Sequence, residues 1–200
     1  GHIEIYDQDI IEISNLNRQI AHKNEHIGNN KAENLAQECL KINPKISVIS
    51  QKKKFDETIS VENFDLIFDC SDSPKIKYTL NYLSHKSKKI LISGSAVQME
   101  GQLAVWKSGL NKDYPCYECV FPKTFEKAPT TNCREAGIIG PMTSLIGSMQ
   151  VNEAIKEIAL RNYQSTAGNL FLFDGVTLIL DKIKLTKNQL CSLCSNLNHE

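Results

Sequence analysis

The sequence predicts an α/β fold, with a largely parallel sheet, flanking helices and antiparallel strands at the C-terminal end. Short apolar segments alternate with segments of helical periodicity through about residue 95, which is typical of stacked parallel βαβ units. Beyond Gly101 this alternation stops, and a strand, an irregular proline-containing stretch, a helix and closing strands are expected. The sequence contains no internal repeat, low-complexity tract or clear linker, so a single domain over residues 1–200 is expected.

In the first half of the chain, short runs of apolar and β-branched residues predict strands over residues 3–6, 46–49, 66–68 and 89–92. A helix is expected between the first two strands, because apolar residues recur at i, i+3, i+4, i+7 and i+8 from Ala32 to Leu40. Asn43-Pro44 ends this helix. A second helix is expected to begin at Ser73-Pro74, since proline suits the first turn.

In the second half, a strand is expected over residues 102–106 and a helix from near Pro141. Two strands, 169–173 and 176–185, close the chain. Asp174-Gly175 between them predicts a tight hairpin turn.

The charge balance and hydropathy exclude several classes of protein. Lysine plus arginine equals aspartate plus glutamate, at 23 residues each, so no net charge attracts nucleic acid or anionic lipid. No apolar run approaches the ~18 residues that cross a bilayer, and no signal peptide opens the sequence. A cytoplasmic protein without a membrane or nucleic-acid partner is therefore expected. The chain begins at Gly1 and enters a strand at once, so an N-terminal piece is expected to be missing.

Four of the seven cysteines form two Cys-x-x-Cys pairs, Cys116 with Cys119 and Cys191 with Cys194. Four soft thiolates in two pairs suit tetrahedral zinc, and with all four positions filled the metal would be structural. It would clamp the C-terminal tail to the irregular stretch. The alternatives are a redox pair or four unrelated buried cysteines. Of the three remaining cysteines, Cys39 and Cys70 fall on apolar faces and are expected in the core.

Two acids end the first predicted strand. Asp7 and Asp9 stand there, and a polar segment with Asn15, Arg18 and Gln19 follows. Ligands of open α/β sheets bind at the carboxyl ends of strands. An acid there can accept hydrogen bonds from ribose hydroxyls, and an arginine can hold phosphate oxygens in a bidentate fork. This pattern indicates a nucleotide half-site; the alternative is a capped turn between two elements.

A second strand end, expected on the same side of the sheet, carries Asp69 and Asp72. With Arg18 and Lys31, the acids could assemble a site for magnesium and a triphosphate, since Mg²⁺ prefers one or two carboxylates plus phosphate oxygens. The basic pair would neutralise charge that develops on phosphorus. Taken singly, Asp72 can instead be a helix N-cap or first-turn acid, and Lys31 a solvated first-turn lysine.

Cys133 belongs to no pair and lies in a loop beside Arg134. Arg134 and a following helix N-terminus would both lower the pKa of a thiol, which makes Cys133 a candidate nucleophile. An inert loop thiol is the alternative.

Taken together, these motifs resemble the ThiF/MoeB/HesA family, the prokaryotic relatives of ubiquitin-activating enzymes. The resemblance covers essentially the whole chain, and the motifs occur in the family's order: Asp7-x-Asp9, Ser14-Asn15-Leu16-Asn17-Arg18-Gln19, Lys31, Asp69-Cys70-Ser71-Asp72, the two Cys-x-x-Cys pairs, and Ala136-Gly137-Ile138-Ile139-Gly140-Pro141. It implies a Rossmann-like fold. It also implies ATP-dependent adenylation of the C-terminal glycine of a ubiquitin-fold sulfur carrier that ends in Gly-Gly, with release of pyrophosphate.

The resemblance also implies a role for each matching residue. Asp7 and Asp9 would lie at the nucleotide, with Asp7 on the ribose. Phosphates would be contacted by Asn15, Arg18 and Lys31. Gln19 would support their loop, and Asp72 would bind Mg²⁺. Cys133 matches a cysteine that links covalently to the activated carrier in some members. A homodimer and a sulfur-donor protein are implied as partners.

Two segments are closer to ThiF than to MoeB: Asn132-Cys133-Arg134 and Leu172-Phe173-Asp174-Gly175. Within the family, ThiF serves thiamine thiazole synthesis, and MoeB serves molybdopterin synthase. A catalytically impaired, zinc-stabilised carrier-binding protein is an alternative. A Rossmann dehydrogenase is a weaker one, since it gives no reason for four zinc cysteines.

The sequence departs from the family pattern in three places. No G-x-G-x-x-G loop occurs, and that loop, its strand and an arginine lent across the dimer would precede Gly1. Without that strand, a neighbouring parallel strand is expected to have unpaired backbone groups. Ser73 stands where asparagine is usual, and Lys77 where arginine is usual.

Overall fold

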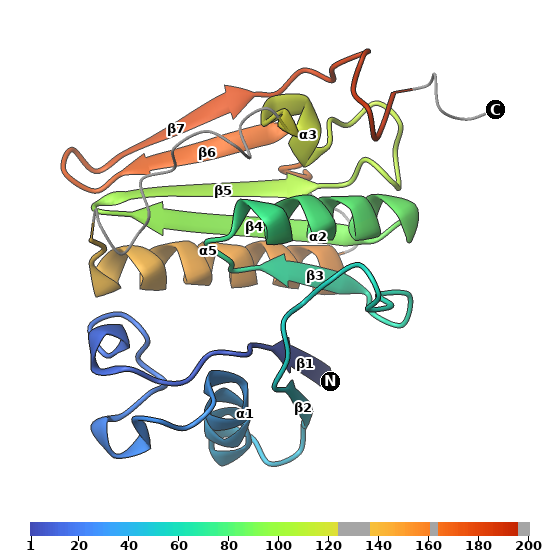
Figure 1. Cartoon of the computed structure of the whole chain (residues 1–200). Helices are drawn as coiled ribbons and strands as arrows, with labels where there is room; N and C mark the ends of the chain where they lie inside the picture. The colour runs from blue at the N-terminus through green and yellow to red at the C-terminus, as the bar shows by residue number, and fades with distance from the viewer. Residues whose placement is uncertain (124–136, 161–163, 196–200) are drawn as a thin grey trace. The chain divides into compact units, whose positions relative to one another are not determined.

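The computed structural model describes residues 1–123, 137–160 and 164–195 (Figure 1). Contacts between Cα atoms divide the chain into two compact units, Gly1–Asp56 and Glu57–Glu200. Each unit has its own sheet, and each is described by itself below.

The first unit is a two-stranded parallel sheet with one α-helix. Strand β1 (His2–Tyr6) pairs with β2 (Ser47–Gln51), and helix α1 (Lys31–Ile42) connects them and packs against both. Two short 3₁₀ helices, η1 (Ile13–Asn15) and η2 (Asn24–His26), lie in the loop between β1 and α1. The strands and the helix agree with the sequence prediction.

The second unit is a five-stranded sheet of order β3-β4-β5-β6-β7. Its strands are β3 (Leu66–Asp69), β4 (Ile90–Val97), β5 (Glu100–Trp106), β6 (Asn169–Asp174) and β7 (Ile179–Lys184). The pair β3–β4 is parallel and the other three pairs are antiparallel. The predicted change from parallel to antiparallel strands is therefore confirmed.

Helices cover both faces of this second sheet. Helix α2 (Pro74–Lys86) and the short α3 (Tyr117–Val120) lie on one face, and α5 (Gly140–Ala159) lies on the other (Figure 1). Two glycines let α5 approach closely. A Cβ atom added at Gly94 would lie 2.5 Å from Gln150 Cδ, and one at Gly101 would lie 2.5 Å from Ile146 Cδ1. A larger residue at either position would require the Gln150 or Ile146 side chain to shift. The core between β4, β5 and α5 includes Ile92, Leu103 and Ala154.

Two local predictions are wrong. The hairpin between β6 and β7 is not the two-residue turn expected at Asp174-Gly175 but a turn over residues 175–178. Asp174 stabilises it by accepting hydrogen bonds from Val176 N (2.8 Å) and Thr177 Oγ1 (2.8 Å). Cys70, expected in the core, is exposed, because it follows the last residue of β3 and leaves the sheet; Cys39 is half-buried.

In the described residues the edge strands are β1 and β2 in the first unit and β3 and β7 in the second. In the described part of the chain, β1 pairs with β2 alone and β3 with β4 alone. Among the described residues each therefore has one edge without a backbone partner.

Candidate functional site

The carboxyl end of β1 and the N-terminus of α1 form one hydrogen-bonded unit. The Asn30 side chain donates to the backbone oxygens of Asp7 (2.9 Å) and Asp9 (3.1 Å). Lys31 N donates to Asp9 O (2.9 Å), and Lys31 Nζ lies 3.2 Å from Asp9 Oδ2. The structure thus brings together three of the residues that the sequence analysis singled out, Asp7, Asp9 and Lys31.

The sequence analysis missed Asn30, which organises this unit. Its side-chain oxygen also accepts from Glu33 N (3.1 Å), so the same side chain caps α1 and holds the loop after β1. An asparagine directly before a helical pattern is a readable N-cap signal. Its bonds to Asp7 and Asp9, residues more than twenty positions away, are tertiary and carry no sequence signal.

Burial and charge oppose each other at Asp7. Burial raises the pKa of this carboxyl above its usual value, while a hydrogen bond from Asp9 N and the charge of Lys31 lower the pKa. Asp7 Oδ1 accepts the bond from Asp9 N at 2.9 Å. A carboxylate has two oxygens and about four lone-pair sites, so Asp7 keeps capacity to accept from ligand hydroxyls.

The 3₁₀ helix η1 and the loop after it contain the other predicted residues of the phosphate site. Asn15 is 6% exposed, and its side-chain oxygen accepts from Glu12 N (3.0 Å), which shapes the loop. Arg18 Nη1 donates to Ser14 O (2.9 Å) and Asn17 Oδ1 (2.9 Å). Gln19 has a buried side-chain oxygen without a hydrogen-bond partner among the described residues. The contacts of these residues with a nucleotide remain predictions.

The two acids after β3 have different environments. Asp69 is 1% exposed, its Oδ2 lies 2.9 Å from Lys77 Nζ, and its Oδ1 accepts from Ser71 N (3.0 Å) and Ser71 Oγ (2.7 Å). Asp72 is exposed and makes no hydrogen bond or ion pair within residues 1–123, 137–160 and 164–195. Asp69 is therefore occupied by structural contacts, and Asp72 is the carboxylate available to a metal ion. Asp72 is not the N-cap of α2, because Ser73 holds that position.

A second residue that the sequence analysis missed lies on α5. Gln150 is buried, and its Nε2 donates to Asp69 O (3.0 Å) and Ile92 O (3.0 Å). Its Oε1 lies 3.7 Å from Cys70 Sγ. Gln150 therefore fixes the carboxyl end of β3, from which Asp72 follows. In the sequence it is one of several polar residues of this helix, so nothing singles it out.

The predicted residues fall into the two units. Asp7, Asp9, Asn15, Arg18, Gln19 and Lys31 belong to Gly1–Asp56, whereas Asp72 belongs to Glu57–Glu200. Convergence of Asp72 with the others on one ligand remains a prediction. Cys133, the candidate nucleophile, lies outside the described residues.

The four paired cysteines form one cluster in the second unit. The sulfur atoms of Cys116, Cys119, Cys191 and Cys194 all lie within 4.8 Å of one another. Individual separations are 3.6 Å for Cys116–Cys191 and 3.3 Å for Cys119–Cys194. A tetrahedron with Zn–S bonds of about 2.3 Å places its sulfurs about 3.8 Å apart. The donor set and its spacing therefore fit zinc.

The thiols of this cluster do not titrate independently. Hydrogen bonds from Cys116 and Cys194 lower the pKa of the Cys119 thiol, while the hydrogen bonds to Cys119 and Cys194, and burial, raise the pKa of Cys116. Without a bound cation, the cluster therefore disfavours deprotonation of several thiols at once. A divalent metal would stabilise all four thiolates, because a coordinating thiol is deprotonated.

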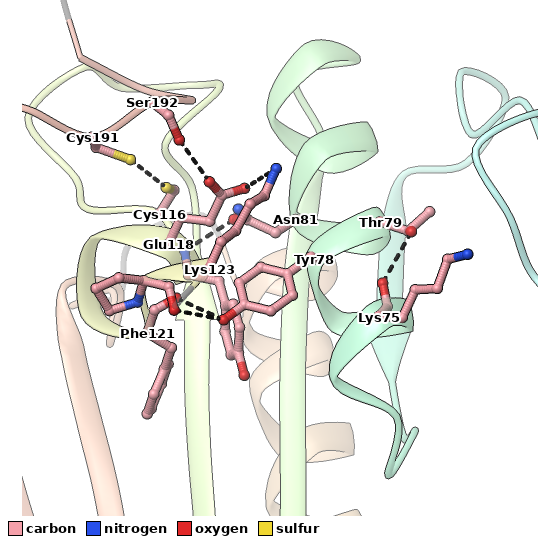
Figure 2. A network of polar contacts seen from close by, with 12 residues as sticks. Lys75, Tyr78, Thr79, Asn81, Cys116, Glu118, Phe121, Lys123, Cys191 and Ser192 are labelled. Carbon is pink, nitrogen blue, oxygen red and sulfur yellow. Dashed lines mark hydrogen bonds and ion pairs between the residues drawn. The ribbon is translucent and has the colours of Figure 1, made fainter. Parts of the chain in front are cut away.

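Helix α2 is attached to the segment that carries the first cysteine pair (Figure 2). Asn81 Oδ1 accepts from Tyr117 N (2.9 Å), and Tyr78 Oη donates to Phe121 O (3.1 Å) and Pro122 O (3.0 Å). The Tyr117 ring contacts the Tyr78 ring, with centroids 5.3 Å apart. The position of the first cysteine pair is thus coupled to α2, the helix that begins two residues after Asp72.

The fold and the cysteine cluster define an α/β protein with an antiparallel extension and a candidate four-thiolate metal centre. The chain belongs to the ThiF family, whose model matches residues 1–193. The family resemblance inferred from the motifs is thereby confirmed.

Curated relatives agree with this assignment. The chain is 35% identical to adenylyltransferase and sulfurtransferase MOCS3 of Caenorhabditis briggsae in an alignment of 200 positions, which covers 98% of this chain and 49% of that protein. It is 36% identical to the protein of the same name in Drosophila persimilis, with 98% and 43% covered. The chain therefore spans about half the length of these relatives.

Solved structures share the fold. A crystal structure of E. coli MccB with ATP matches with a TM-score of 0.80 and 20% identity, covering 98% of this chain and 59% of that one. A structure of E. coli MccB with AMPCPP and MccA matches with a TM-score of 0.81 and 22% identity, covering 98% and 60%. Among the described helices of our chain, none has the length and hydropathy needed to cross a bilayer.

Proposed function

We propose that this chain is the adenylation module of an enzyme that activates the C-terminal glycine of a ubiquitin-fold carrier protein with ATP. The observation that carries the proposal is the unit formed by Asp7, Asp9, Asn30 and Lys31 at the carboxyl end of β1. It sets a half-buried carboxylate beside a lysine at a helix N-terminus, where a ribose and an anion are both favoured. Two further findings support it: the relatives named adenylyltransferase and the shared fold of MccB.

In the proposed reaction a carboxylate oxygen of the carrier's terminal glycine attacks the α-phosphorus of ATP. The bond between the α-phosphorus and the bridging oxygen breaks, and pyrophosphate leaves with the electron pair. Asp7 would hold the ribose, Arg18 and Lys31 would neutralise phosphate charge, and Asn15 would contact a phosphate. Such chemistry needs positioning and charge neutralisation more than a strong base.

Three residues have supporting roles in this proposal. Asp9 pairs with Lys31 Nζ and would aim it at the phosphates. Gln19 would support the phosphate loop. Asp72 would bind Mg²⁺, which would supply further charge neutralisation at the phosphate oxygens. The cysteine cluster would hold a structural zinc ion, since its four ligand positions leave no site for water.

Two observations favour different carrier proteins. The motifs around Cys133 and Asp174 are closer to ThiF and the thiazole pathway, whereas the relatives carry the name MOCS3 and favour the molybdopterin pathway. We give the second more weight, because it rests on whole-chain identity rather than on two short segments. The proposed partners are a Gly-Gly-ended carrier of that pathway, a sulfur-donor protein and a second copy of the chain.

ATP–pyrophosphate exchange in the complete natural polypeptide tests the proposal. Exchange that depends on a Gly-Gly-ended carrier is expected, and it should fall at least tenfold in Lys31→Ala. Lys41→Ala is the matched control, since Lys41 is an exposed lysine in the last turn of the same helix. Running the assay with carriers of both pathways identifies the preferred one. Absence of exchange with either carrier would contradict the proposal.

A catalytically impaired, zinc-stabilised carrier-binding protein is the second candidate, since the four-cysteine cluster could stabilise the chain without ATP. Calorimetry separates the two candidates. Carrier binding without ATP binding would support the second, and tight ATP binding would exclude it.

A further inference from the structure

The two cysteine pairs are joined by a side-chain hydrogen bond as well as by their sulfurs. Glu118 lies between Cys116 and Cys119, and Ser192 lies between Cys191 and Cys194. Ser192 Oγ donates to Glu118 Oε2 at 3.0 Å, so the bond links segments 74 residues apart in sequence (Figure 2). Each partner is held within a Cys-x-x-Cys turn, and the bond therefore fixes one turn against the other.

The position of Glu118 is unfavourable unless it has a specific partner. The residue is 5% exposed and lies in sequence between Cys116 and Cys119, whose thiols would become thiolates around a metal. A buried carboxylate costs free energy unless hydrogen bonds or a counter-charge compensate it. Among the described residues, Glu118 Oε1 forms an ion pair with Lys123 Nζ at 3.8 Å, but the lysine side chain is 61% exposed, so that pair contributes little. The hydroxyl of Ser192 is the better partner.

The geometry on both sides of the bond is rigid. Cys116 is the N-cap of α3, which carries Glu118 and Cys119. On the other side, Ser195 N donates to Cys191 O (3.2 Å) and Cys191 N to Asn188 O (3.1 Å), which closes the turn that presents Ser192. A bond between two rigid turns limits the relative positions of all four sulfurs.

We propose that Glu118 is a positioning residue for the metal: by accepting from Ser192, it holds the two cysteine pairs at tetrahedral spacing before the ion binds. Assembly of the site then requires less ordering of two distant segments, which raises metal affinity. The inference rests on the proposed zinc site.

Metal affinity in Glu118 and Ser192 variants tests this inference. The complete natural polypeptide is stripped of metal, and its Zn²⁺ affinity is measured by competition with a chromogenic chelator. Glu118→Ala and Ser192→Ala should each weaken affinity by roughly 10- to 100-fold, the usual effect of losing an outer-shell partner. The double variant should bind Zn²⁺ no more weakly than the weaker-binding single variant, because each change removes the same hydrogen bond between Ser192 and Glu118. Glu118→Gln keeps an acceptor oxygen and should keep the wild-type affinity.

Lys123→Ala is the matched control. It removes the ion-pair partner of Glu118 but leaves the hydrogen bond, so Zn²⁺ affinity should not change. A loss as large as that of Glu118→Ala would assign the effect to charge and overturn the inference. Additive losses in the double variant, or single variants that bind as tightly as wild type, would also overturn it.

The Co²⁺ absorption spectrum separates failure of this inference from failure of the zinc site itself. A tetrahedral thiolate spectrum in wild type establishes the site, and its band positions should shift in Ser192→Ala while the protein remains folded by circular dichroism. If wild type shows no such spectrum and no tight Zn²⁺ binding, the zinc proposal fails. Should Glu118→Ala not fold, Ser192→Ala, which deletes one hydroxyl oxygen from an exposed residue, supplies the decisive measurement.

Discussion

At the scale of single residues, the candidate site depends on carboxylates whose environments differ. Asp69 is enclosed by Lys77 and Ser71, while Asp72, three residues later, is exposed. Of the two acids in this motif, Asp69 therefore has a structural role, and Asp72 is accessible to a ligand. Asp7 lies between these extremes, because it is half-buried and keeps lone pairs for a ligand.

Asp7→Asn tests the role of Asp7, because the change should preserve or raise the stability of the fold while it weakens ATP binding. Burial raises the pKa of Asp7 in the folded protein above its value in the unfolded chain. Ionisation of Asp7 therefore destabilises the folded protein as pH rises from the unfolded pKa through the folded one, and this loss of stability persists at neutral pH. Asp7→Asn removes that deficit and keeps an oxygen for Asp9 N. Its Tm at pH 7 should equal or exceed that of wild type, while ATP affinity should fall roughly 10- to 100-fold through lost charged hydrogen bonds.

Thermal unfolding at several pH values and calorimetric titration with ATP provide these measurements. The Tm advantage of Asp7→Asn should shrink as pH falls towards the ordinary aspartate pKa of 3.8. A variant that is less stable at pH 7 but binds ATP normally would show that Asp7 is a structural acid.

Cys133 provides a second prediction at the residue scale. Cys133→Ser should leave ATP–pyrophosphate exchange at the wild-type rate, because the acids and bases of the proposed adenylation site are elsewhere. Sulfur transfer to the carrier should fall to background, since serine cannot form the sulfur link. Loss of exchange in this variant, measured beside a Cys39→Ser control, would show that Cys133 acts in the first step.

At the scale of elements, polar side chains attach two helices to distant segments: the N-cap residue of α1 and two residues within α2. Helix α1 is fixed to the loop after β1 by Asn30, and α2 is fixed to the first cysteine pair by Tyr78 and Asn81. In each case a side chain satisfies backbone groups of a distant loop, which positions the loop with the helix.

Replacement of Asn30 should affect stability and ligand binding together. Asn30→Ala removes an N-cap, which costs about 0.5–2 kcal/mol, and it releases the loop that holds Asp7 and Asp9. Urea unfolding should show the loss, and ATP affinity should fall at least tenfold. Asn43→Ala at the other end of α1 is the control and should leave ATP affinity unchanged. If both variants bind ATP equally well, Asn30 is only a cap.

Removal of zinc should loosen α2 before it loosens α5. Tyr117 N, Phe121 O and Pro122 O, the partners of Asn81 and Tyr78, lie next to the first cysteine pair, whereas α5 packs against β4 and β5. Hydrogen exchange after chelation should therefore rise more in α2 than in α5. A uniform rise would indicate global unfolding, and no rise in α2 would show that the helix is independent of the metal.

At the scale of the whole molecule, each unit has a sheet with an open parallel edge. In the described residues β1 and β3 each lack a partner on one side. The cysteine cluster, by contrast, closes its own unit, because it joins segments 75 residues apart. A structural metal that joins such distant segments contributes its binding free energy to folding.

The sequence by itself determined the α/β order, the span of α1 and the two cysteine pairs, since periodicity and Cys-x-x-Cys spacing are local and survive without tertiary contacts. Only the tertiary structure decided that Asp69 is enclosed while Asp72 is exposed, that Asn30 and Gln150 hold the strand ends, and that Glu118 meets Ser192. The physical reason is that these outcomes depend on hydrogen bonds between residues far apart in the chain, and burial after folding decides which polar groups must find a partner.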